Sequence, residues 1–152
     1  MKAFIDKYLG AFLVWLLVAM TVDVLWGVFT RYVLGGQASW TEELARFMLI
    51  WLGVLGAAYA SGQRMHLAID LIQPKLETSN QKRLIQVIAS LIALFALCVL
   101  LIGGLRLVYI THILEQRSPA LQLPMTIVYG VVPISGLLIL YYQMLRIRNP
   151  LN

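Results

Sequence analysis

Charged residues and cysteine are both scarce in this chain. Only 12% of its 152 residues are charged, and the single cysteine, Cys98, excludes an intramolecular disulfide and a cysteine metal cluster. The sequence contains no HExxH helix, phosphate-binding loop, dinucleotide-binding loop or nucleophile with an adjacent base. We therefore expect no catalytic site, no metal site and no cofactor.

Hydrophobic residues make up 61% of the sequence and gather in four runs. A helix that crosses the hydrocarbon core of a bilayer needs ~20 apolar residues, and each run has about that length. Only a helix or a closed barrel satisfies its own backbone in lipid. The runs therefore predict an all-α integral membrane protein with one domain, residues 1–152, and four spans at about 9–30, 43–61, 82–110 and 125–145.

Two of the spans are expected to be irregular. A helix from Ser79 to Leu114 would be about 54 Å long at 1.5 Å per residue, which exceeds a hydrocarbon core of about 30 Å. It must tilt, project beyond the bilayer, or kink near Gly103 and Gly104. In the last span, Pro133 is expected to bend the helix.

Lysine and arginine are distributed unevenly between the predicted loops, and cytoplasmic loops are enriched in these residues. With both termini inside, eight basic residues are cytoplasmic and three are outside, while Arg106 lies within the third span. This predicts an N-in/C-in topology, and the net charge of +5 then reflects topology and contact with anionic lipid, not nucleic-acid binding. The cytoplasmic set is Lys2, Lys7, Arg64, Lys75, Lys82, Arg83, Arg146 and Arg148, and the outer set is Arg31, Arg46 and Arg117.

The sequence QASWTEELARF, which starts at Gln37, has the features of a helix beginning. Ser39 and Glu42 have the spacing of a capping box, and Glu42 and Arg46 can pair one turn apart. With Trp40, this stretch predicts a short amphipathic interfacial segment before the second span. Glu42, Glu43 and Arg46 serve either as a helix cap with one exposed pair or as a polar contact with a partner subunit.

Small residues follow at helical spacing along the same stripe. Gly53, Gly56 and Ala60 would let another helix approach closely, as packing inside a bilayer favours. We call these three residues the small-residue seam.

Asp23 and Arg106 are the charged residues that are most costly to place within the predicted spans. Such residues usually face the interior of a helix bundle and have a partner. Both should lie at similar depth in the outer half, so we predict an intramembrane ion pair that fixes helix packing. The alternative is a proton or ion relay.

The two histidines invite a haem interpretation. His66 and His112 fall near opposite surfaces in the predicted topology, so they cannot bind one iron within one chain. Haem binding is therefore not expected.

Three segments together resemble a known family. RYVLGG at 31–36, WTEELARFMLIWLGVLGAAYA at 40–60 and HLAID at 66–70 are similar to the small, DctQ-like membrane subunit of tripartite ATP-independent periplasmic (TRAP) transporters. The resemblance covers essentially the whole chain through its length, its four spans and the order of these segments.

The resemblance implies a bacterial inner-membrane location and a heterodimer with a large membrane subunit. That subunit would hold the substrate and sodium sites and move as an elevator, and this chain would enlarge its fixed scaffold. A periplasmic binding protein would deliver an organic acid and make transient contact. The predicted contact residues, which face the outer side, are Arg31, Trp40, Glu42, Glu43 and Arg46.

Other functions remain open at this point. The chain could be an autonomous homo-oligomeric transporter with Asp23 as its coupling carboxylate. It could also be the membrane anchor of a redox enzyme, or an unrelated structural or assembly factor.

Overall fold

A computed structural model describes residues 2–36, 38–63 and 78–148, and these residues are almost entirely helical. The described part contains no β-strand, and four of its helices are long and apolar enough to cross a membrane. This confirms the all-α, four-span prediction. The helices are α1 (Lys2–Val33), α2 (Ser39–Gly62), α4 (Thr78–Phe95), η2 (Ala96–Gly103), α5 (Gly104–Ile113), α6 (Met125–Tyr129) and α7 (Val131–Arg148).

The third span is one uninterrupted rod made of α4, η2 and α5. Its middle part, η2, is a π-helix that ends at Gly103, the first residue of the glycine pair near which a kink was expected. The glycines of this region allow close packing: a Cβ on Gly104 would lie 3.0 Å from the ring of Pro133, and one on Gly136 would lie 3.0 Å from Leu100. The third and fourth spans therefore approach each other at backbone distance.

The fourth span is interrupted at Gly130, between α6 and α7. Pro133 follows three residues later, and a proline has no N–H to donate and its ring crowds the carbonyl four residues before it, that of Tyr129. The break therefore lies where Pro133 was expected to bend the helix. Beside the break, the indole Nε1–H of Trp51 donates to the carbonyl of Val128 at 3.1 Å and ties α2 to α6.

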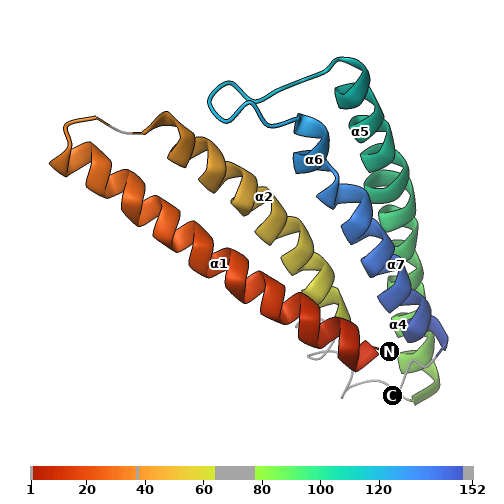
Figure 1. The fold of residues 1–152 in the computed structure, drawn as a ribbon. Coiled ribbons are helices and arrows are strands. Elements are labelled where there is room, and N and C mark those ends of the chain that lie inside the picture. Colours follow the sequence, from red (N-terminus) through yellow and green to blue (C-terminus); the bar gives the residue numbers. More distant parts are fainter. Residues whose placement is uncertain (1, 37, 64–77, 149–152) are drawn as a thin grey trace.

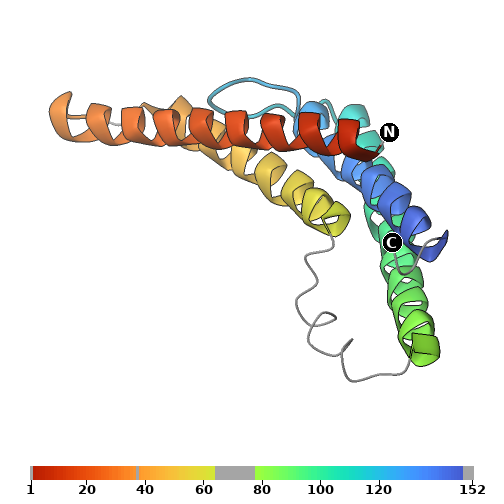
Figure 2. The same cartoon turned by 90° about the horizontal axis from the view of Figure 1, so that it is seen from below.

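The helices form two arms that diverge from one end, as Figure 1 shows. One arm is the pair α1 and α2, and the other contains the third and fourth spans. Helix α1 packs chiefly on α2, whereas α7 packs on both α2 and η2. A small core at Ala58, Ala96 and Ile139 joins the arms. Figure 2 shows that α4 turns away from α1, so α1 lies at the edge of the molecule.

The arms meet where the start of α1 and the ends of α2 and α7 come together. Here the hydroxyl of Tyr142 donates to Asp6 Oδ1 at 2.6 Å, and Gln143 Nε2 donates to Ser61 Oγ at 2.7 Å. The backbone of Gly62 also abuts Tyr142, whose ring would lie 2.7 Å from an added Cβ. We call this the closed end, and we call the opposite end, where the α1–α2 and α5–α6 connections lie, the open end (Figure 1).

The beginning of α2 differs from the sequence-based expectation. Ala38 occupies the N-cap position and makes no side-chain cap hydrogen bond, so the capping box of Ser39 and Glu42 is not formed. Ser39 is already the first helical residue, and the hydroxyl of Thr41 donates to the Ala38 carbonyl at 2.7 Å instead. Residues 39–46 are the first turns of α2 and continue directly into the span.

A candidate docking surface at the open end

The loop between α5 and α6 is fastened to α2 by one carboxylate. Oε2 of Glu43 accepts hydrogen bonds from Ser118 Oγ at 3.0 Å, the Ala120 N–H at 3.0 Å and the Leu121 N–H at 2.7 Å. Both Glu43 and Ser118 are buried. Hydrogen bonds to a charged acceptor are the stronger ones in proteins. Glu43 therefore holds the loop 114–124 against the beginning of the second span.

This gives Glu43 a different role from the predicted one. It was expected to contact a partner from the outer surface, but its side chain serves the chain's own loop. The buried residues of α2 are Thr41, Glu43, Phe47, Leu55, Ala58, Ser61 and Gly62. Because an α-helix has about 3.6 residues per turn, most of these residues lie on the side of α2 roughly opposite the predicted stripe through Glu42, Arg46, Gly53, Gly56 and Ala60. The recurrence of Glu43 with Phe47 one turn later was the signal that could have revealed its inward direction.

Glu42 and Arg46 form the predicted pair. Arg46 Nη2 lies 3.3 Å from Glu42 Oε1, and both side chains are about two-thirds exposed, at 67% for Glu42 and 65% for Arg46. The pair borders a shallow hollow of 370 Å³ that is also lined by Ser39, Pro119 and Ala120. Glu42 and Arg46 therefore present their charges to the outside of the chain.

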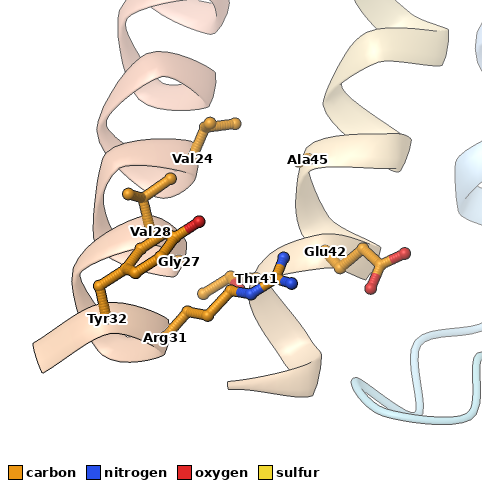
Figure 3. A pocket seen from close by; sticks show the side chains of 8 residues that line it. All are labelled: Val24, Gly27, Val28, Arg31, Tyr32, Thr41, Glu42 and Ala45. Carbon is orange, nitrogen blue, oxygen red and sulfur yellow. The ribbon is translucent and has the colours of Figure 1, made fainter. Parts of the chain in front are cut away.

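A second hollow lies between the end of α1 and the beginning of α2. Its volume is 280 Å³, and Figure 3 shows Arg31 reaching from α1 toward Thr41 on α2. The guanidinium carbon of Arg31 lies 5.9 Å from the ring centre of Tyr32. Trp40 is 41% exposed nearby on α2. Arg31, Trp40, Glu42 and Arg46 are thus all accessible at the open end, as a docking surface requires.

The described part of the chain does not fill the small-residue seam. A Cβ added to Gly53 or Gly56 would meet no atom within 4 Å, and Ala60 is half-buried. The seam therefore remains open to a helix from another chain.

The predicted ion pair of Asp23 and Arg106 is not formed within the described part of this chain. Neither carboxylate oxygen of Asp23 has a hydrogen-bond partner there, although Asp23 is buried, and Arg106 is exposed on α5. The two helices are not neighbours: α1 packs on α2 and lies away from α5. A similar predicted depth in the membrane therefore does not bring their side chains together.

The remaining candidates are the two histidines and the HLAID segment. His112 is exposed on α5, while His66 and the HLAID segment lie outside the described residues. Within residues 2–36, 38–63 and 78–148, no three histidine, cysteine or acidic side chains are grouped as metal ligands.

Comparison with known proteins places these features in one family. Residues 20–152 match the family model of tripartite ATP-independent periplasmic transporters, DctQ component. The chain is 29% identical to a TRAP transporter small permease protein of Haemophilus influenzae, over 90% of this chain and 83% of the relative. It is 28% identical to the C4-dicarboxylate TRAP transporter small permease protein of Rhodobacter capsulatus, over 67% of this chain and 44% of the relative.

A third relative is much longer than this chain. The isethionate TRAP transporter permease protein DctMQ of Oleidesulfovibrio alaskensis is 31% identical over 87% of this chain, which spans only 21% of that relative.

Proposed function

This chain belongs to the DctQ family, the small permease component of TRAP transporters in the bacterial inner membrane, and we propose that it is the fixed accessory subunit of one such transporter. In this role it packs on the scaffold of a large membrane subunit as a heterodimer. The large subunit carries the moving transport machinery, and this chain anchors it laterally in the bilayer.

The observation that carries this proposal is the uncovered apolar surface of α1. In the apolar 18-residue stretch of this helix, only 11% is buried by the rest of the described chain. In the corresponding stretch of the fourth span, 39% is buried. Trp15 is 74% exposed and Tyr32 is 78% exposed on this helix. Together with the unfilled seam on α2, this leaves two faces that can pack against a second membrane protein.

The proposal includes the orientation and the transported substrate. With the closed end in the cytoplasm, the excess of lysine and arginine lies inside, as the positive-inside rule requires. The open end then faces the periplasm, where Arg31, Trp40, Glu42 and Arg46 meet a substrate-binding protein. Because the relatives are named for isethionate and C4-dicarboxylates, we propose sodium-driven uptake of an organic acid.

The experiment is an affinity purification of the tagged chain from its native membrane in mild detergent, followed by intact-mass measurement. A large permease subunit recovered in a one-to-one ratio is the expected result. Reconstituted vesicles should then take up substrate only when both membrane subunits, the binding protein and a sodium gradient are present. A stable homo-oligomer without a second membrane protein would overturn the proposal.

A further inference from the structure

An apolar groove runs along the open half of α1 and the first turns of α2. Its volume is 710 Å³, and three tryptophans stand among the residues that line it. The lining residues are Trp15, Val18, Ala19, Val22, Asp23, Trp26, Trp40, Leu44 and Met48. We call it the Asp23 groove.

Asp23 is the sole acidic residue in this lining and is out of place in it. Its residue is 6% exposed, so it is more than nine-tenths buried, and both of its oxygens lack a hydrogen-bond partner within the described residues. Burying a charged carboxylate without a partner is expensive, and in a membrane it is more so. The carboxylate of Asp23 in this groove therefore needs a hydrogen-bond donor.

The described part of this chain does not meet that demand. Arg46 is engaged by Glu42, at the exposed start of α2. Arg31 follows Asp23 by eight residues on α1, or about 12 Å along the helix, and its guanidinium carbon lies 5.9 Å from the ring centre of Tyr32. Lipid acyl chains could cover the apolar side chains of the groove, but they have no hydrogen-bond donor for the Asp23 carboxylate. A protein helix with a cationic side chain satisfies both the walls and the charge.

We propose that a membrane-spanning helix of the large permease subunit occupies the Asp23 groove and presents a lysine or arginine to Asp23. This inference rests on the proposed function, since it names the face and the charge through which the two subunits join. The groove residues of α1 pack the partner helix, and Asp23 fixes its register. The relative named DctMQ joins a small permease part to a longer permease in one chain, and this covalent link is consistent with a lasting contact between the two subunits.

Photo-crosslinking tests which molecule fills the groove. Benzoylphenylalanine replaces either Trp26, which lines the groove and is 48% exposed, or Leu17, which lies on the far side of α1 and is 47% exposed. Both variants are irradiated in native membranes together with the large subunit, and the products are identified by mass. The position at Trp26 should crosslink to the large subunit at least about fivefold more than the position at Leu17.

Substitutions of Asp23 test the charge. Asp23→Lys should lower the amount of large subunit recovered with the chain by about tenfold or more, because two cations would then share a buried site. Asp23→Leu should also lower it, and Asp23→Asn, whose amide still accepts a hydrogen bond, should retain more than either. Thr21→Lys is the matched control, since it places the same cation on the exposed far side of α1.

The outcomes separate the two proposals. If the unmodified chain recovers no large subunit, the proposed function fails. If it recovers the large subunit but Trp26 crosslinks only to lipid or to a second copy of this chain, the groove has another occupant and the inference fails alone. If the Asp23→Lys variant recovers as much large subunit as the unmodified chain, the proposed lysine or arginine partner of Asp23 is also ruled out.

Discussion

Ser118 donates its hydroxyl to Glu43 Oε2 at 3.0 Å, across 75 residues of sequence. This contact and the two backbone donors beside it make the connection between the third and fourth spans part of the same surface as the start of the second. The exposed charges of Glu42 and Arg46 and the loop residues Pro119 and Ala120 therefore border one hollow. The candidate docking surface depends on Glu43, although Glu43 itself is hidden.

Removing the Glu43 carboxylate should release the loop. Glu43→Ala leaves the N–H groups of Ala120 and Leu121 without their acceptor, and we expect the free energy of unfolding to fall by about 2 kcal/mol. The free energy of unfolding is measured by adding a denaturing detergent to the protein in mild detergent. In a second measurement, protease cleavage within residues 114–124 should increase. Glu42→Ala is the control, because that side chain is exposed and should cost less than about 0.5 kcal/mol. Equal effects of the two substitutions would contradict the anchoring role.

Reversing the exposed charges should weaken docking of the binding protein without unfolding the chain. Glu42→Lys together with Arg46→Glu keeps the pair but inverts its polarity. Because charges at the edge of an interface act mainly on the association rate, the binding-protein concentration that gives half-maximal uptake should rise by about three- to tenfold at low salt. Uptake by reconstituted vesicles measures it. An unchanged concentration dependence would remove these residues from the docking surface.

Adding a methyl group at Gly62 should disturb the closed end. The new Cβ of Gly62→Ala would lie 2.7 Å from the ring of Tyr142, so the ring must shift and its hydrogen bond to Asp6 is disturbed. We expect a loss of about 1–3 kcal/mol, as for other overpacked sites. Tyr142→Phe, which removes only the hydrogen bond, should cost about 1 kcal/mol. A Gly62→Ala variant as stable as the unmodified chain would show that the ends of α2 and α7 are less closely packed.

The seam should respond in the opposite way. A Cβ added at Gly53 meets no atom of the described residues within 4 Å. Leucine also favours a helix more than glycine by about 0.8 kcal/mol, so we expect the isolated Gly53→Leu chain to be as stable as the unmodified one or more stable. A helix of the large subunit packed on the seam would be pushed away, and its recovery in affinity purification should fall severalfold. Recovery equal to that of the unmodified chain would place the large subunit elsewhere.

The sequence alone determined the spans and the local pairing. Four apolar runs of bilayer length require four helices, because lipid offers the backbone no hydrogen-bond partner. The interval of four residues brings Glu42 and Arg46 together on any helix. The bend near Pro133 follows from the missing N–H of one residue. Each of these properties depends on neighbours in the chain, so a pattern of residues is sufficient to predict it.

Only the tertiary structure decided which way the charged residues point. Glu43 and Glu42 are adjacent and chemically alike, but one is buried against Ser118 and the other is exposed, since successive residues differ by 100° around a helix. Asp23 and Arg106 were expected at a similar depth, but within the described residues Asp23 has no hydrogen-bond partner. Hydropathy predicts position along the membrane normal and leaves the lateral arrangement of helices to packing. The neighbours of α1 are set by the shapes of helix faces, and those faces meet only in the folded chain.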